Sequence, residues 1–189
     1  AAPMHNLGYY SLPQDLVPSK MELTNDYLYV SASGYKFPYI NTEYEDKRVI
    51  LVYERESRDP DNYTIPDEDG KDRDILYSLR LDFEDVPDNL VSIGNLLFAS
   101  SKKDSIAVIS LSNPLKPCVI KKIDKGFLNG REKSLSPSKL EAYNNKLHVI
   151  SNKARYIFDA SKPTIPQIGS FKGDKNTKIL NSGKLSAES

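Results

Sequence analysis

The fold is indicated most clearly by Arg155–Lys172, which reads Arg-Tyr-Ile-Phe-Asp-Ala-Ser-Lys-Pro-Thr-Ile-Pro-Gln-Ile-Gly-Ser-Phe-Lys. An earlier stretch, Ile106–Ile123, aligns with it without a gap, and the matches include Ser112 on Ser161, Pro114 on Pro163, Pro117 on Pro166 and Val119 on Ile168. Self-similarity at a period of roughly 40–50 residues is the mark of a repeat architecture. The sequence therefore predicts a repeated structural unit, and this repetition names no activity.

The beginning of the unit occurs three times. The three copies align from a proline and are Pro18–Val30, Pro87–Ala99 and Pro137–Val149. Each contains a turn pair that tolerates the positive φ of a two-residue hairpin, namely Asn25-Asp26, Gly94-Asn95 or Asn144-Asn145. After each turn, leucine and valine or alanine share one face of a strand, and the opposite face keeps a ring: Tyr29, Phe98 and His148. Both faces are therefore expected to be covered, as in a sheet between two like sheets.

Two further strands are expected in each unit. The third strands are Val49–Tyr53, Ile106–Leu111 and Tyr156–Ala160, and the fourth are Ile75–Leu81, Cys118–Ile123 and Gln167–Lys172. Four short antiparallel strands per repeat are typical of β-propeller blades, so the fold class is all-β. The expected boundaries are 1–13 for the last strand of a preceding blade, 17–82, 86–124 and 136–173 for three full blades, and 174–189 for the start of a further blade or a tail.

The third strands resemble those of the LVIVD-repeat family, which is named for its Leu-Val-Ile-Val-Asp strand. The best match is Tyr156–Asp159 followed by Ser161-Lys162-Pro163, and Val108–Ser110 with Ser112-Asn113-Pro114 lacks the Asp. The first unit keeps only Val49–Val52 and has no Ser-x-Pro-x-x-Pro. Members of that family are mostly bacterial, exported or surface-associated proteins. The resemblance implies a binding scaffold at the cell surface, outside the cell or in the periplasm.

The number of repeat units bears on whether they can close a propeller ring. Three full blades and one leading strand cannot close a ring that holds about four to eight blades. Either the chain is an excerpt of a longer protein, or other chains complete the ring. We favour the excerpt, and we expect Leu7–Leu12 to be the leading strand and Thr177–Leu180 with Lys184-Leu185 to begin a further blade around a turn at Asn181–Gly183.

Composition excludes several classes of function. The 189 residues are 39% hydrophobic, and the 26 Lys and Arg balance the 26 Asp and Glu, so no overall field favours nucleic acid. No apolar run approaches the ~18 residues of a membrane helix, and the N-terminus carries no signal peptide. The single cysteine, Cys118, is expected to be a buried small side chain.

Two long loops distinguish the first unit. Gly34–Lys47 carries Tyr35, Phe37, Tyr39 and Tyr44, and Ser57–Asp74 carries a run of acids. The aromatic loop is either a recognition surface, since tyrosine is enriched at interfaces, or a loop that folds its rings onto its own blade. Because antiparallel strands reverse direction at each turn, the two loops are expected at opposite rims.

The acidic loop contains the ingredients of a calcium site. Asp67, Asp69, Asp72 and Asp74 alternate with other residues around Gly70. The spacing differs from an EF-hand, and Lys71 and Arg73 offset part of the negative charge. We therefore interpret this loop as a solvated acidic segment, with calcium binding as the weaker alternative.

No catalytic constellation is evident in the sequence. His5 and His148 are the only histidines, and His148 holds a packed ring position, so we interpret it as structural. Two histidines and one cysteine cannot supply the usual zinc sets, and no glycine-rich phosphate loop is present. Asp159 is interpreted as the cap of the turn that follows it rather than as an acid or base.

The sequence thus favours a non-enzymatic interaction module that binds a protein partner or other chains of an assembly, without a cofactor. The alternative is a calcium-supported or hydrolytic propeller whose catalytic residues lie outside this stretch. A calcium titration separates the two, since affinity lost when Asp67 and Asp69 become Asn would favour the alternative.

Overall fold

Antiparallel strands account for all of the regular structure that is described. The computed structural model describes residues 12–13, 15–35, 38, 43–55 and 75–173, and within these residues every regular element is a β-strand. The described residues therefore also contain no helix that could cross a membrane. The all-β prediction is confirmed for this part of the chain. The expected strands in Leu7–Leu12, apart from Leu12 itself, and in 174–189 lie outside it.

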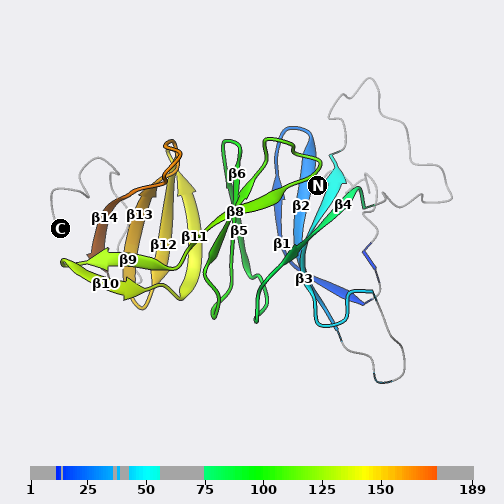
Figure 1. Ribbon diagram of the computed structural model, residues 1–189, viewed down its shortest axis with the longest axis horizontal. Coiled ribbons are helices and arrows are strands. Elements are labelled where there is room, and N and C mark those ends of the chain that lie inside the picture. Colours follow the sequence, from blue (N-terminus) through cyan, green and yellow to red (C-terminus); the bar gives the residue numbers. More distant parts are fainter. Residues whose placement is uncertain (1–11, 14, 36–37, 39–42, 56–74, 174–189) are drawn as a thin grey trace, which may run out of the picture.

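Three four-stranded antiparallel sheets follow one another along the chain (Figure 1). Sheet one contains β1 (Leu16–Leu23), β2 (Tyr27–Gly34), β3 (Arg48–Glu54) and β4 (Tyr77–Leu81). Sheet two contains β5 (Asn89–Ile93), β6 (Leu96–Ser100), β7 (Ile106–Ser110) and β8 (Cys118–Ile123). Sheet three contains β11 (Pro137–Tyr143), β12 (Lys146–Ser151), β13 (Ala154–Asp159) and β14 (Gln167–Lys172). In each sheet the strands are paired in chain order, as the aligned segments predict.

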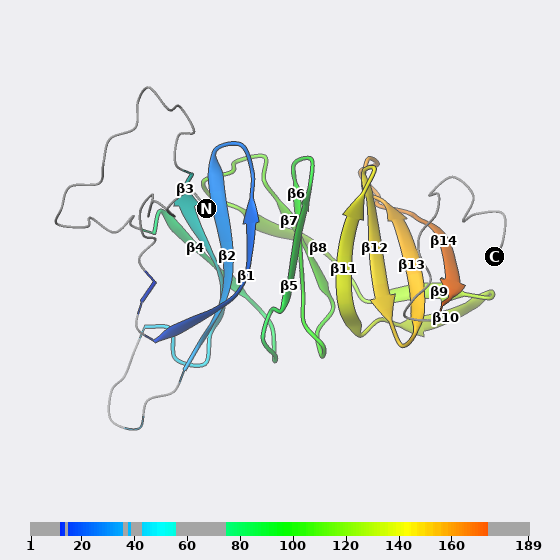
Figure 2. The same cartoon turned by 180° about the vertical axis from the view of Figure 1, so that it is seen from behind.

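The sheets stand side by side in the order in which they occur in the sequence (Figures 1 and 2). Their first strands are neighbours, because β5 lies beside both β1 and β11. Apolar clusters fill the two spaces between sheets, and a third covers the side of sheet one that faces away from sheet two. The described part is an open array of three sheets and contains no closed ring.

The three ring positions occupy equivalent places in the array. Tyr29 belongs to the cluster between sheets one and two, and Phe98 to the cluster between sheets two and three. His148 lies on the side of sheet three that faces away from sheet two, since its neighbours Leu147 and Val149 face sheet two. All three rings have 0% exposure, so the predicted burial is confirmed.

The turn pairs differ in backbone conformation. Asn144 and Asn145 both have positive φ, as a two-residue hairpin of this type requires, and in the second turn Gly94 has positive φ. Neither Asn25 nor Asp26 does, so the expectation of positive φ is wrong for the first turn. There, the Thr24 hydroxyl and amide both donate to the Tyr27 carbonyl, which closes the hairpin in another way.

Hydrogen bonds, in addition to apolar contacts, join neighbouring sheets. From sheet one, the Ser19 hydroxyl donates to the Pro87 carbonyl at 2.6 Å and the Tyr29 hydroxyl to the Pro114 carbonyl at 2.7 Å. In the other direction, the Ser92 hydroxyl donates to Glu22 at 3.0 Å. Burial raises the pKa of Tyr29 to about 12, so its hydroxyl keeps the proton that it donates.

A two-stranded hairpin that the repeat pattern does not predict connects sheets two and three. It consists of β9 (Lys125–Leu128) and β10 (Arg131–Ser134). Its backbone at Phe127 exchanges two hydrogen bonds of 2.8 Å with the Gln167 side chain of β14. Leu128 enters the cluster between the two sheets. The hairpin therefore covers the outer part of the interface between sheets two and three. At the corresponding place between sheets one and two, the described residues contain only the connection between β4 and β5.

Cys118 is exposed, so the expectation of a buried cysteine is wrong. Cys118 begins β8, and the first five residues of this strand are exposed. Among the described residues β8 pairs only with β7 and is an edge strand. Its position at the periphery, rather than its residue type, decides its exposure.

Candidate functional site

The base of the aromatic loop is fixed by backbone hydrogen bonds. The Gly34 amide donates to the Lys47 carbonyl at 2.8 Å, and the Lys47 amide donates to the Tyr44 carbonyl at 3.0 Å. Gly34 lies so close to the Tyr44 backbone that a Cβ at this position would overlap the Tyr44 carbonyl group. The two ends of the loop are therefore held against each other, and only glycine fits at this contact.

Asp15 ties both ends of the loop to the entry of β1. Its buried carboxylate accepts a hydrogen bond of 3.1 Å from the Tyr44 amide, and its backbone carbonyl accepts one of 2.9 Å from the Tyr35 amide. The Tyr35 side chain is nevertheless 54% exposed. Tyr35 is thus an exposed ring on a fixed backbone, which is favourable for binding because little backbone entropy remains to be lost.

Tyr44 is oriented differently. Its ring packs against the cluster of Leu28, Val30 and Tyr53 on sheet one. Burial, with a smaller contribution from Glu43, raises the pKa of the Tyr44 hydroxyl, and a hydrogen bond with Ser78 opposes this shift. Tyr44 thus covers its own sheet, and of the four aromatic candidates Phe37 and Tyr39 lie outside the described residues.

The two loops of sheet one begin at opposite ends of the sheet. Ser33 pairs with Arg48 at the end that carries the aromatic loop, and Tyr27 pairs with Glu54 at the other end, from which the acidic loop starts. Asp67, Asp69, Asp72 and Asp74 themselves lie outside the described residues. Within residues 12–13, 15–35, 38, 43–55 and 75–173, no three His, Cys, Asp or Glu side chains are grouped as a metal site would require.

Asp159 and the turn after β13 form a local cap. The Asp159 carboxylate accepts hydrogen bonds from the Ser161 hydroxyl at 2.6 Å and from the Ser161 amide at 3.1 Å. These bonds, with the nearby Lys162, lower the pKa of Asp159. The interpretation of Asp159 as the cap of this turn is confirmed.

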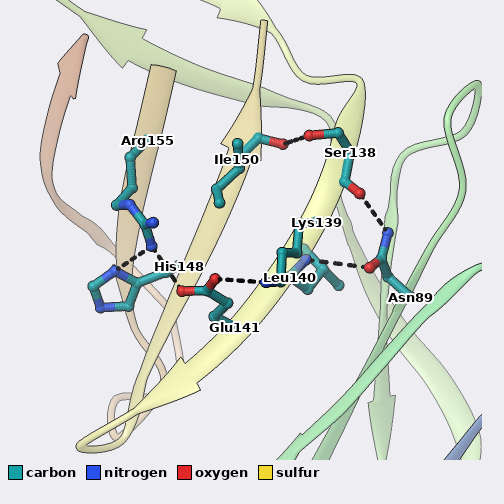
Figure 3. Close-up of polar contacts among 8 residues, drawn as sticks. All are labelled: Asn89, Ser138, Lys139, Leu140, Glu141, His148, Ile150 and Arg155. Carbon is teal, nitrogen blue, oxygen red and sulfur yellow. Dashed lines mark hydrogen bonds and ion pairs between the residues drawn. The ribbon is translucent and has the colours of Figure 1, made fainter. Parts of the chain in front are cut away.

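His148 lies in a polar cluster on sheet three (Figure 3). The Arg155 guanidinium is 2.9 Å from the Glu141 carboxylate and 3.5 Å from Nδ1 of His148. Because arginine can only donate, Nδ1 must accept, so the neutral ring carries its proton on Nε2. Nε2 is buried and has no hydrogen-bond partner among the described residues. No signal in the sequence could have shown this unpaired donor.

The cluster makes stability depend on pH. Burial, and secondarily Arg155, lower the pKa of His148 from 6.5 to about 4. Between these values the unfolded chain binds more protons than the folded one, so this contribution to stability is present at neutral pH and is lost as the pH falls. We expect the parent to lose about 2 kcal/mol from this source between about pH 7 and pH 5.

Urea titrations of the parent and of the His148→Phe variant measure the effect. Phenylalanine is chosen because sheet two has Phe98 at the equivalent position. The two slopes of stability against pH should differ in that range, and the substituted protein should be the less sensitive. Equal slopes would show that His148 takes up its proton in the folded protein as readily as in the unfolded chain, so that folding does not lower its pKa.

Comparison with known proteins gives no match to a family model and none to a curated protein.

Proposed function

We propose that the chain is part of a β-propeller that serves as a non-enzymatic binding scaffold for a protein partner, in an exported or cell-surface bacterial protein. Two observations support the scaffold. Three like sheets stand side by side with their first strands adjacent, as blades do around an axis. The resemblance of Tyr156–Asp159 and its following turn to LVIVD repeats favours the same architecture and an exported location.

The observation that carries the binding proposal is the exposed Tyr35 on a loop base fastened by Asp15 and Gly34. Tyrosine buries a large apolar ring while its hydroxyl still finds a partner, so it is suited to a protein interface. The corresponding connection of sheet three is only Asn152-Lys153 between β12 and β13, both with positive φ. Phe37 and Tyr39 of the same loop belong to the predicted recognition surface and lie outside the described residues.

Shortening the loop tests the proposal. Replacing residues 34–47 by Asn-Lys, the two residues that connect the paired Ser151 and Ala154 in sheet three, should leave the protein folded and abolish capture of its partner from a lysate. Some stability will be lost, because the change also removes the ring of Tyr44 from its cluster. Circular dichroism and quantitative mass spectrometry of the captured proteins give the two readouts.

A Tyr44→Ala variant serves as the matched control. It should lose roughly 1–2 kcal/mol of stability, less than a fully buried ring would because Tyr44 is only partly buried, and still capture the partner. Capture by the shortened protein at the parent's level would refute the assignment of the loop.

A further inference from the structure

Beside the exposed Tyr35, sheet one carries two polar groups that its fold leaves without partners. Ser33 pairs with Arg48, and this is the last pair of β2 and β3 before the aromatic loop. The Ser33 hydroxyl and Nε of Arg48 are both buried, and neither has a hydrogen-bond partner among the described residues. Ser33 as a whole is only 9% exposed. A buried polar group that has lost water and gained no partner costs free energy, so this pair requires an explanation beyond the fold itself.

The two groups lie on one face of sheet one, together with Tyr35. Residues paired across antiparallel strands have Cβ atoms about 5 Å apart on the same side of the sheet. Ile50, two residues after Arg48, packs against sheet two, so Ser33 and Arg48 face the end of the space between sheets one and two. The Tyr35 amide continues the pairing by its bond to the Asp15 carbonyl, so alternation places the Tyr35 ring on this face too. We call Ser33, Tyr35 and Arg48 the rim site.

The guanidinium of Arg48 is incompletely used. One Nη nitrogen donates a long hydrogen bond of 3.4 Å to the Glu84 carbonyl, and Arg48 forms no ion pair with a described carboxylate. A guanidinium has five N–H donors and keeps its charge at any physiological pH. The side chain is only partly buried, so its outer nitrogens can be reached from solvent.

Asp104, the acid that interacts with Arg48 at longer range, is engaged elsewhere. Its carboxylate oxygens accept hydrogen bonds from the amides of Glu84 and Asp85, at 2.9 and 3.0 Å, and from the Ser101 hydroxyl at 2.5 Å. Burial acts against ionisation, but these bonds and the Arg48 charge outweigh it and lower the pKa of Asp104. Asp104 therefore holds the connection between β4 and β5, and Arg48 is left without a close counter-ion among the described residues.

We propose that the rim site receives an aspartate or glutamate side chain of the protein partner, whose carboxylate pairs with Arg48 while a neighbouring apolar residue packs on Tyr35. Arginine suits this role because its planar fork can bind a carboxylate through two parallel hydrogen bonds. The Ser33 hydroxyl is a further donor on the same face. This inference rests on the proposed function, because it names the chemistry that the partner presents beside Tyr35.

The same charge disfavours basic partners. A lysine or arginine brought next to Tyr35 would meet the Arg48 guanidinium at short range, and like charges that face each other across an interface are unfavourable. The rim site thus distinguishes between segments that the Tyr35 ring alone would bind equally well.

Selection from a phage-displayed library of random linear peptides on the immobilised full chain tests this preference. We expect the parent to enrich Asp and Glu near an aromatic or aliphatic residue, by about threefold to fivefold over the starting library, as for a solvent-accessible ion pair. Arg48→Gln removes the charge and should abolish the preference for acids while the preference for apolar residues remains. Arg48→Lys, which restores the charge, should recover part of it.

Lys102→Gln is the matched control. Lys102 is an exposed cation in the connection between β6 and β7, at the same end of the neighbouring sheet. Its removal changes the net charge as Arg48→Gln does, but it should leave the enrichment of acids as in the parent. Circular dichroism checks that each variant folds, which we expect of Arg48→Gln because it loses one long hydrogen bond only.

The proposal is overturned if the parent enriches no acidic peptides, whether it selects other peptides or none, or if Arg48→Gln and Lys102→Gln give the same result. Failure of the proposed function would look different. Peptides that are lost with Tyr35→Ser but show no preference for acids would refute the role of Arg48 and leave the binding loop in place. Lysate capture that is unchanged by Tyr35→Ser would instead refute the binding loop.

Discussion

Replacing Phe98 by alanine is expected to lower the free energy of unfolding by about 4 kcal/mol. Phe98 is fully buried in the cluster that joins sheets two and three, together with Leu128 of the connecting hairpin. Removal of the ring costs its transfer free energy and leaves a cavity that surrounding strands, fixed by their ladders, can fill only in part. The loss should appear in urea unfolding, as a lower midpoint with little change in slope.

Phe127→Ala is the matched control, because it removes the same ring from a side chain that is 54% exposed. It should change stability by less than about 1 kcal/mol. A similar small loss for Phe98→Ala would mean that sheets two and three do not share a packed interface in solution.

Gly34→Ala should have the second largest effect, a loss of roughly 3 kcal/mol, at the upper end for overpacking. The added methyl group would overlap the Tyr44 carbonyl, and this neighbour is backbone, held by the hydrogen bond from the Lys47 amide. Relief requires the base of the loop to open, which would also release the Tyr44 ring from sheet one. Thermal unfolding and amide exchange at Tyr35 and Lys47 measure both consequences.

Gly169→Ala provides the comparison within a strand. A Cβ at Gly169 would meet only the end of the Ile157 side chain, at 3.9 Å, which is ordinary contact. Its effect on stability should therefore be small. If Gly34→Ala were tolerated equally well, the ends of the aromatic loop could not be as close as the structure places them.

Much of the fold could be predicted because the repeat carries its own register. A hairpin turn fixes which residues pair, and alternation then fixes which face each side chain takes. From the turn at Asn144-Asn145 it follows that Leu147 and Val149 share a face and that His148 takes the other. The third and fourth strands agree with those expected to within about two residues at each end, whereas β2 continues to Gly34, beyond the aligned segment that ends at Val30.

The hairpin β9–β10 could not be predicted in this way. It occurs once, between sheets two and three, so comparison of the repeats contains no information about it. Its strands are short and mostly exposed, and their residues show little apolar alternation. The contacts that define it, between Phe127 and Gln167, join residues far apart in sequence.

The sequence indicated which segment forms the candidate site, but not the orientation of its side chains. Clustered tyrosines mark the aromatic loop, yet Tyr35 is exposed and Tyr44 packs on its own sheet. Composition cannot separate these two orientations, because they depend on where Asp15 holds the loop. In the same way, the role of His148 as a packed ring follows from alignment. That its Nε2 has no hydrogen-bond partner among the described residues follows only from the side chains around the ring.

The central claim, that this chain binds its partner through the aromatic loop of sheet one, is tested most directly by two single substitutions. Tyr35→Ser removes the exposed ring at the base of the loop, and Tyr143→Ser removes an equally exposed ring from sheet three. Both proteins should fold as the parent does. Quantitative mass spectrometry of proteins captured from a lysate should show the partner lost with Tyr35→Ser, by about tenfold or more, and retained with Tyr143→Ser. Equal capture by the two proteins, or a loss confined to Tyr143→Ser, would contradict the account.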